Sequence, residues 1–387
     1  MSRRTLGPLA AFAAFGVFWG AWGVLLPDVK EQVGASVAEL GAALLAVGLA
    51  ALPAMLVTGL IADRVGGRAV APALILFGAA IVVPGLTDSV WQLALAMAAV
   101  GAASGALDVV INVAATTVEA SGGPRIMQIA HALFSAGFLV AAIAVGLLRD
   151  AGVEPLPVLI GAAVVLLATA WLNRGTPLGP APPRGGRGLR FPRRVLVLGG
   201  LCAIAFVAES GIENWSALFL EDELDAAPAV SGLGPGLFAA AMVTGRTLGQ
   251  GLEARVGDRP LLAGGALVAA GGLTLAAVSP GVPAALVGFA LGGAGISVAA
   301  PTLFGAAGRG ASDAERGSAV ASVTTIAYLG FLAGPFIMGS VSGAVGLRAG
   351  MALLAGTAVL VAVGAASFAG NALPLRRLQH PPRGGLP

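Results

Sequence analysis

Long apolar segments recur along the whole chain and are separated by short polar segments. The hydrocarbon core of a bilayer is about 30 Å thick, so a helix needs about 20 apolar residues to cross it. The segments match this length, and we therefore predict an all-α integral membrane protein with twelve transmembrane helices. The predicted spans are 6–26, 38–62, 69–87, 91–118, 126–148, 155–172, 195–220, 229–253, 260–279, 282–307, 315–342 and 348–370.

The composition supports a chain embedded in lipid and excludes several other classes of protein. Hydrophobic residues make up 57% of the 387 residues and charged residues 11%, whereas a typical soluble protein has about 25% charged residues. Basic residues outnumber acidic ones only by 22 to 19 and lie in short loops, so we expect no nucleic-acid partner. The single cysteine, Cys202, cannot form an intramolecular disulfide, and no metal-ligand spacing occurs in the sequence.

The basic residues also indicate the orientation of the chain. If the N-terminus is cytoplasmic, eighteen basic residues fall on the cytoplasmic side and three on the other, with Arg246 inside a span. Cytoplasmic loops carry an excess of Lys and Arg. We therefore predict a multi-pass protein of the inner (plasma) membrane with both termini in the cytoplasm. The first apolar segment is too long for a signal-peptide core and is followed by no A-x-A-like cleavage site, so we expect it to be retained.

The spans are predicted to form two halves. Six spans lie on either side of a segment rich in Pro, Gly and Arg, which has the composition of a flexible linker. The predicted units are an N-terminal six-helix bundle (1–172), a cytoplasmic linker (173–194), a C-terminal six-helix bundle (195–371) and a cytoplasmic tail (372–387). The sequence R-V-G-x-R follows span two and recurs after span eight. This repeat indicates two pseudo-symmetric bundles of parallel orientation.

The loop between spans two and three resembles the signature loop of the major facilitator superfamily. It reads G-x-x-x-D-R-x-G-x-R, with Gly59, Asp63, Arg64, Gly66 and Arg68 in the motif positions. The resemblance covers essentially the whole chain and implies a transporter with two bundles around a central cavity. It also implies that the loop network holds the outward-facing state closed and breaks during transport. The other interpretation is that the arginines only anchor the chain in the headgroup layer.

The second half carries degenerate counterparts of first-half segments. Arg255 and Arg259 occupy the arginine positions of the second R-V-G-x-R loop, and we assign them to the same gating loop. In span eleven, Ile326-Ala327-Tyr328 matches Ile129-Ala130-His131 of span five. Tyr328 is the only tyrosine, and we expect it and His131 to line the central cavity.

A narrower resemblance is to the fucose permease branch and its largely uncharacterised bacterial members. It is carried by the segments 105–112, 127–137 and 209–218. In span four that permease has an E-x-x-x-N arrangement whose Glu is regarded as a proton-coupling group, and Asp108 and Asn112 match those two positions. The permease also has an acidic residue directly before an I-L-L-P segment in span one, where this chain has Gly23.

Ionisable groups inside the spans are the main candidates for function, because each costs about 2.5–3.5 kcal/mol at mid-bilayer on insertion scales. Asp108 is a candidate protonatable group facing the cavity; the alternative is a structural hydrogen bond or ion pair between helices. Asn112 lies one turn further along the same face. It is a candidate for binding solute hydroxyls, and equally a polar contact between two helices.

Span seven carries a second group of candidates. Glu209 and Glu213 lie one turn apart, and two ionised carboxylates there would repel each other, so the pair is a candidate proton site. The alternative for Glu213 is a solvated position near the outer interface. Trp215 is a candidate for stacking on a sugar ring, and alternatively a member of the aromatic belt at the membrane interface.

Three further polar residues lie within the spans. Arg246 is either a counter-ion to Glu209 or Asp108, an anchor for an anionic solute, or a side chain that snorkels to the cytoplasmic interface. His131 is either a proton relay or a helix-packing group. Gln128, one turn before His131, is a candidate for substrate binding.

These patterns predict a secondary active transporter rather than an enzyme. The sequence contains no Walker loop, nucleophile elbow or HExxH motif, and we expect no cofactor and no metal. The predicted function is proton-coupled symport of a small polar solute, such as a sugar or related metabolite, by alternating access. The expected partners are the solute, protons and membrane lipid, with the protein acting as a monomer. Two alternatives remain open: a drug or metabolite efflux exporter, and a membrane receptor or scaffold without transport.

Overall fold

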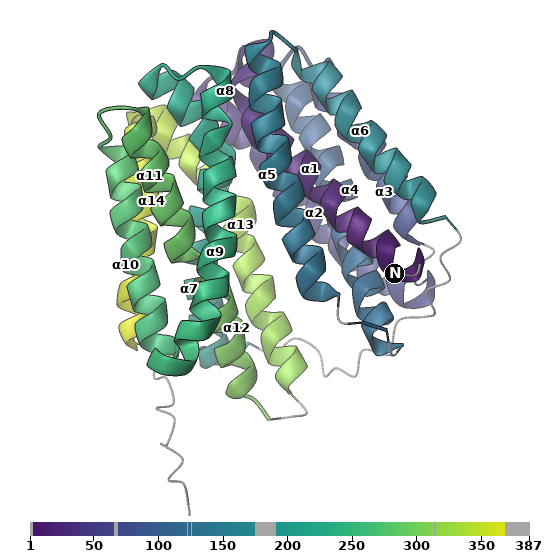
Figure 1. The fold of residues 1–387 in the computed structure, drawn as a ribbon, viewed down its shortest axis with the longest axis vertical. Helices are drawn as coiled ribbons and strands as arrows, with labels where there is room; N and C mark the ends of the chain where they lie inside the picture. The colour runs from purple at the N-terminus through teal and green to yellow at the C-terminus, as the bar shows by residue number, and fades with distance from the viewer. Residues whose placement is uncertain are drawn as a thin grey trace, which may run out of the picture.

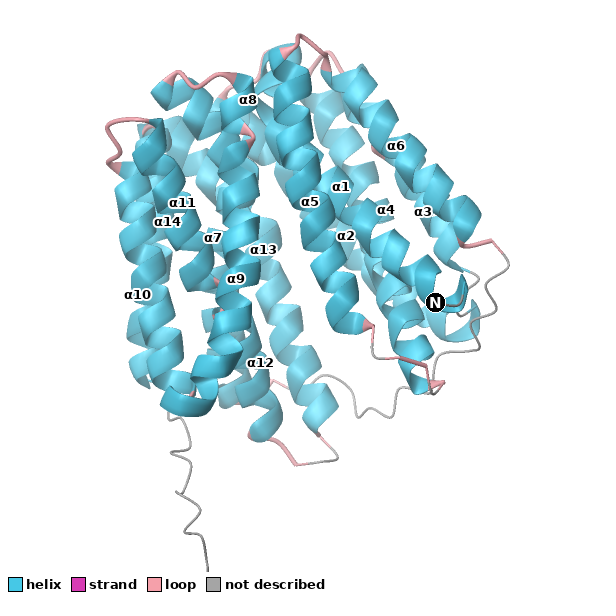
Figure 2. Cartoon of the chain, in the orientation of Figure 1, coloured by secondary structure: helices cyan, strands magenta, loops and turns pink. Residues whose placement is uncertain are grey.

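The computed structural model describes residues 3–65, 69–121, 123–124, 126–174, 191–312 and 315–367. These residues form helices and connecting turns, with no strand among them, so the predicted all-α fold is confirmed (Figure 2). The helices of the first half are α1 (Arg3–Gln32), α2 (Val37–Val65), α3 (Val70–Ala80), the 3₁₀ turn η2 (Val83–Leu86), α4 (Val90–Ala120), α5 (Met127–Asp150) and α6 (Pro155–Leu172). Those of the second half are α7 (Arg193–Leu224), α8 (Pro228–Ser231), α9 (Leu233–Val256), α10 (Asp258–Ala277), α11 (Val282–Ile296), α12 (Ala299–Arg309), α13 (Arg316–Val345) and α14 (Leu347–Ser367).

The apolar segments match the predicted spans, apart from a shorter third span and two spans that are divided. Eleven helical segments of the described chain are long and apolar enough to cross a membrane. The third predicted span is shorter: α3 has 11 residues and is followed by η2, so that together they cover Val70–Leu86. Pro84 is the second residue of η2, and because it has no N–H it cannot donate the hydrogen bond that would continue α3 as an α-helix. Spans eight and ten are each divided, into α8 and α9 and into α11 and α12.

The helices pair in the same way in both halves (Figure 1). In the first half α1 packs on α5, α2 on α4, and α3 on α6. In the second half the corresponding pairs are α7 with α13, α9 with α11, and α10 with α14. Because each pair recurs six spans later, the arrangement is a repeat of two six-span bundles.

Small residues allow the paired helices to approach closely. A side chain at Gly16 of α1 would meet the backbone of Phe134 in α5, and a side chain at Gly330 of α13 would meet the backbone of Ala203 in α7. These two contacts occupy equivalent helix pairs. In lipid, where helices gain little from the hydrophobic effect, such close backbone packing is a main source of helix association.

The two bundles meet along a surface that we call the seam, where α1 packs on α7, α2 on α13, and α5 on α9. We call the end of the molecule from which residues 174 and 191 lead into the linker the linker end, and the opposite end the distal end. At the distal end the seam is tight: Gly41 packs on Gly339, and Gly232 packs on Ala142. Toward the linker end the ribbons of the two bundles diverge (Figure 1).

Candidate functional site

Asp108 joins the two bundles midway along α4. The Asn112 side chain, one helical turn further on, donates to Asp108 Oδ1 at 3.0 Å. From the other bundle, the Tyr328 hydroxyl of α13 donates to Asp108 Oδ2 at 3.5 Å. Both oxygens of the carboxylate therefore have a partner, one from its own helix and one from across the seam. The structure thus brings together three of the predicted site residues.

Glu209 and Arg246 form a second polar group at the middle of the seam. Arg246 Nη2 of α9 lies 3.4 Å from Glu209 Oε1 of α7. The Glu209 side chain is 13% exposed and that of Arg246 is 39% exposed. Of the interpretations open for Arg246, the counter-ion to Glu209 is the one that matches this geometry. Its remaining exposure leaves donors available for a further anionic or hydroxyl group.

Glu213 and Trp215 lie closer to the distal end of α7. The backbone carbonyl of Glu213 is so near Gly23 of α1 that a side chain at residue 23 would overlap it. An acidic side chain at this position, as in the fucose permease, has no room here. Trp215 is fully buried and packs against Gly339 of α13. Its assignment to an interfacial aromatic belt is therefore wrong, because a belt residue contacts the headgroup layer.

His131 and Gln128 lie toward the linker end of α5, and both are exposed. The His131 ring makes an edge-to-face contact with Phe12 of α1, with ring centroids 5.1 Å apart. Arg246 of the other bundle lies near enough to His131 that a positive charge on the imidazole would be repelled. Tyr328 lies in the equivalent helix of the second bundle. Its ring makes an edge-to-face contact with Phe206, with ring centroids 6.4 Å apart.

The signature loop lies largely outside the described residues. Gly59 is buried in α2, and Asp63 and Arg64 lie in the last turn of that helix, which ends at Val65. The side chains of Asp63 and Arg64, and the residues Gly66 and Arg68, are outside the described parts. In the second copy of the loop Arg255 and Arg259 are exposed.

Between the two arginines of the second copy, Asp258 makes an ion pair that the sequence reasoning missed. Asp258 pairs with Arg309 at the end of α12, with Arg309 Nη2 to Asp258 Oδ2 at 2.5 Å. Glu253 also approaches Arg309, at 3.6 Å. These residues tie the linker ends of α9, α10 and α12 together within one bundle.

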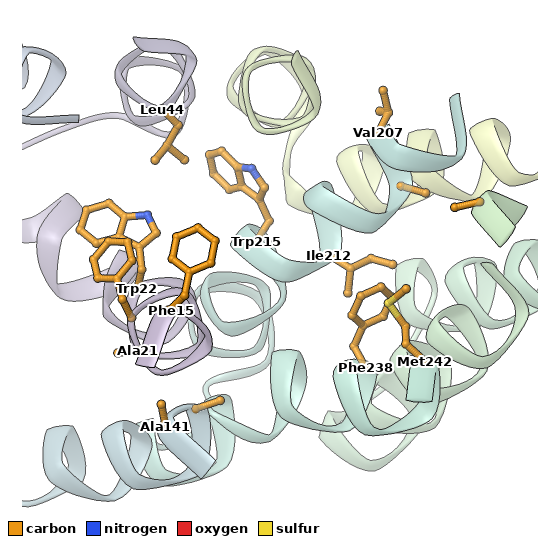
Figure 3. Packing of buried hydrophobic residues seen from close by; sticks show 14 of the residues in the cluster. Phe15, Ala21, Trp22, Leu44, Ala141, Val207, Ile212, Trp215, Phe238 and Met242 are labelled. Atoms are coloured by element: carbon orange, nitrogen blue, oxygen red, sulfur yellow. The ribbon is translucent and has the colours of Figure 1, made fainter. Parts of the chain in front are cut away.

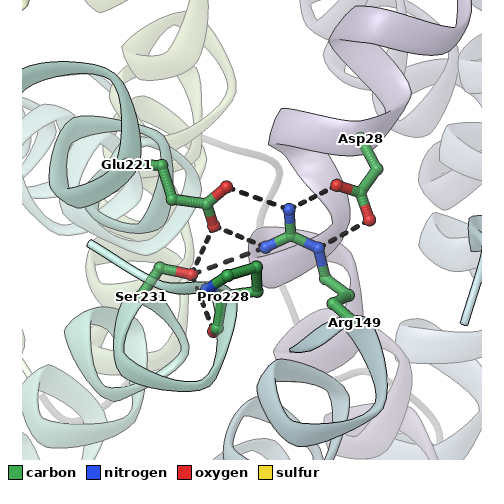
Figure 4. Close-up of polar contacts among 5 residues, drawn as sticks. All are labelled: Asp28, Arg149, Glu221, Pro228 and Ser231. Carbon is green, nitrogen blue, oxygen red and sulfur yellow. Dashed lines mark hydrogen bonds and ion pairs between the residues drawn. The ribbon is translucent and has the colours of Figure 1, made fainter. Parts of the chain in front are cut away.

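A cluster at the distal end was also missed. Arg149 of α5 is buried between Asp28 of α1 and Glu221 of α7, and Ser231 of α8 completes the cluster (Figure 4). From the sequence, Arg149 is one of the three basic residues predicted on the side opposite the cytoplasm. One signal was available, because Asp28, Arg149 and Glu221 all lie within one or two turns of a predicted span end, where charges from different helices can meet.

Fold and site together define a class of protein, namely a two-bundle membrane transporter with polar groups at the middle of the seam. The chain belongs to the Major Facilitator Superfamily, whose family model matches residues 9–252 and 198–385. Membership places it among membrane transporters rather than enzymes. Among the described residues, no group of three or more His, Cys, Asp or Glu side chains is placed to hold a metal ion.

Relatives and solved structures agree with this assignment. The chain is 36% identical over 349 residues to an uncharacterized MFS-type transporter of Yersinia pestis, covering 88% of this chain and 89% of the relative. It is 29% identical to the membrane protein MosC of Rhizobium meliloti, covering 91% and 87%. The fold is shared with the nucleoside transporter NupG, with a TM-score of 0.76, 15% identity and coverage of 95% and 99%. It is also shared with a bacterial homolog of the human lysosomal transporter Spinster, with a TM-score of 0.75, 17% identity and coverage of 94% and 95%.

Proposed function

We propose that the protein is a secondary active transporter that moves a small polar solute across the inner membrane by proton-coupled alternating access. The observation that carries the proposal is the contact between Asp108 and Tyr328. A carboxylate that bonds to both bundles experiences any relative movement of the bundles directly. Conversely, protonation of Asp108 changes what its oxygens can accept, and so changes the strength of the contact across the seam.

Glu209 and Arg246 supply a second coupled element in this proposal. An ion pair at membrane depth is costly to separate, because each partner would then lie alone in a medium of low dielectric. Binding of a proton at Glu209 weakens the pair and releases Arg246 to bind the solute. Asn112 and Gln128 are the remaining polar groups that we assign to solute binding, and the narrower resemblance to the fucose permease branch stays a prediction.

The proposed orientation places the linker end in the cytoplasm, following the excess of basic residues on that side. The distal end, where the bundles are in contact, then faces outward, and the described conformation is the one closed to the outside. In this scheme the signature loop from Gly59 to Arg68, together with Arg255 and Arg259, closes the linker end in the opposite state.

The solute must be identified before transport can be measured. A thermal-shift screen of the purified protein against sugars, organic acids, amino acids and common drugs identifies a ligand, because a molecule that binds only the folded state raises its apparent melting temperature. Repeating the screen at two pH values reveals ligands whose binding is linked to a proton.

The decisive experiment is uptake of that solute into proteoliposomes under an imposed pH gradient. We expect accumulation to rise as the outside is made more acidic, and Asp108→Asn to abolish gradient-driven accumulation while solute exchange at equal concentrations continues. The matched control is Asp88→Asn, which makes the same change at an exposed residue between η2 and α4. Accumulation by Asp108→Asn equal to that of Asp88→Asn would refute proton coupling through Asp108, and the direction of net flux separates uptake from export.

A further inference from the structure

The distal cluster is organised around one arginine that contacts both bundles. Arg149 is 6% exposed. Its guanidinium donates to Asp28 of its own bundle, with Nε to Oδ2 at 2.6 Å. It also donates to Glu221 of the other bundle, at 2.6 Å from Nη1 and 3.0 Å from Nη2 (Figure 4). The fork of an arginine can bind two carboxylates in this way, whereas a lysine ammonium cannot match the geometry.

The second bundle holds Glu221 in position for this contact. The Ser231 hydroxyl lies 2.5 Å from Glu221 Oε1 and 3.0 Å from the carbonyl oxygen of Pro228. A second ion pair crosses the seam nearby, where Lys30 Nζ lies 2.6 Å from Asp222 Oδ2. Two ion pairs between the bundles therefore stabilise the closed distal end. The pair at Arg149 is the more buried of the two.

Two tryptophans in equivalent helices form a second layer, about two helical turns from these charges toward the linker end. Trp22 of α1 and Trp215 of α7 are fully buried, and neither indole nitrogen has a hydrogen-bond partner among the residues that the structure describes (Figure 3). Six positions separate Trp22 from Asp28, and six separate Trp215 from Glu221. Each bundle therefore contributes one indole and one carboxylate at the same spacing, and Arg149 joins the two carboxylates.

The two layers act in opposite directions on the closed distal end. A buried donor without an acceptor loses the hydrogen bond that it would make with water. The indoles therefore favour a state in which water or a polar solute reaches them. Separating Arg149 from Glu221 breaks two charge-assisted hydrogen bonds between the bundles, which opposes that state.

We propose that these groups form one conformational switch, in which Arg149 locks the distal end and the unpaired indoles of Trp22 and Trp215 favour its opening. The inference rests on the proposed alternating access. On opening, Arg149 stays with Asp28, since both belong to the first bundle, while Glu221 and Ser231 move away together with the second. The indole N–H groups then face the opened seam as donors for water or for a solute with oxygen acceptors.

The test measures how often the distal end opens and needs no solute. In a Cys202→Ser background, Ala142→Cys places a thiol at a fully buried position where α5 meets Gly232. The full-length protein in proteoliposomes is treated from the distal side with a membrane-impermeant thiol reagent, and the labelling rate is recorded. We expect Arg149→Gln to raise the rate about tenfold or more, because a buried ion pair between the bundles is lost. We expect Trp215→Phe to lower it several-fold, because the ring is largely kept while the unpaired donor is removed.

Matched controls separate the switch from general loosening. Arg348→Gln removes an arginine at the same end whose ion-pair partner, Glu223, belongs to its own bundle, and Trp91→Phe removes an exposed indole. Both should label at the parental rate. If Arg149→Gln does not fold, Glu221→Gln tests the same contact while leaving Arg149 paired with Asp28.

The outcomes are distinguishable from failure of the proposed function. Labelling of Arg149→Gln (or Glu221→Gln) at the rate of Arg348→Gln overturns the lock, and faster labelling of Trp215→Phe overturns the opposing role of the indoles. If labelling responds as expected but no solute is transported, the switch stands and the transport proposal fails.

Discussion

Glu209 and Arg246 each carry a charge inside the membrane that the other one compensates. Each would be costly alone at membrane depth, and their proximity of 3.4 Å relieves part of that cost. We predict that Glu209→Gln and Arg246→Gln each lower the melting temperature in detergent, and that the double variant recovers most of the loss. The expected coupling is on the order of 1 kcal/mol, since Arg246 is partly exposed. Additive losses in the double variant would show that the pair is not coupled.

The hydroxyl of Tyr328 donates a hydrogen bond to Asp108. Tyr328→Phe keeps the ring contact with Phe206 and removes this hydrogen bond across the seam. We predict a reduced accumulation ratio at a fixed pH gradient, with exchange of solute between equal concentrations retained. Uptake is measured in proteoliposomes, with the melting temperature as the control for folding. An unchanged accumulation ratio would remove Tyr328 from the coupling scheme.

The sequence predicts contacts between residues that are near each other along the chain, and it does not predict contacts between distant ones. The bond between Asn112 and Asp108 joins residues one turn apart on one helix, so it follows from spacing. Tyr328 lies 220 positions from Asp108, and the two meet because α2 packs on both α4 and α13. For the same reason the Arg149 cluster, which joins four helices, was not predictable from local pattern.

At the scale of elements, glycines set how closely helices pair. A side chain at Gly330 would strike the backbone of Ala203, which cannot move without shifting α7. We predict that Gly330→Leu lowers the stability of the folded protein by about 1–3 kcal/mol or more, because overpacking forces α13 away from α7. The matched control is Gly356→Leu in α14, where the added atom meets nothing within 4 Å. The readout is the yield of monodisperse protein in detergent and its melting temperature, and equal behaviour of the two variants would contradict this account of the pairing.

Hydrophobic patterning predicts spans well because lipid demands a fixed apolar length. The extended helices α1 and α7 continue beyond that length to Gln32 and Leu224, where Asp28 and Glu221 enter the distal cluster. The shortening of α3 and the breaks near Gly232 and Ser297 were not predicted, because a proline or glycine within an apolar segment does not reveal whether neighbouring helices will support a continuous helix.

At the scale of the whole molecule, the two bundles repeat the same helix pairing and differ in their charges. The first bundle contributes Arg149, which has partners in both bundles, while Arg246, Arg309 and Arg348 of the second bundle pair with acidic residues of their own bundle. The family assignment and the pairing of helices follow from sequence and fold. The identity of the solute does not, because it depends on a few side chains along the seam rather than on the fold.

The most direct test of alternating access is to hold the distal end closed and measure transport. Ala38 of α2 and Gly343 of α13 adjoin across the seam, so Ala38→Cys with Gly343→Cys in a Cys202→Ser background allows a disulfide between the bundles. We predict that oxidation abolishes uptake of the solute identified by thermal shift and that reduction restores it, while each single-cysteine variant is unaffected by either treatment. Full uptake by the cross-linked protein would contradict the account, because the solute would then cross without the bundles separating at the distal end.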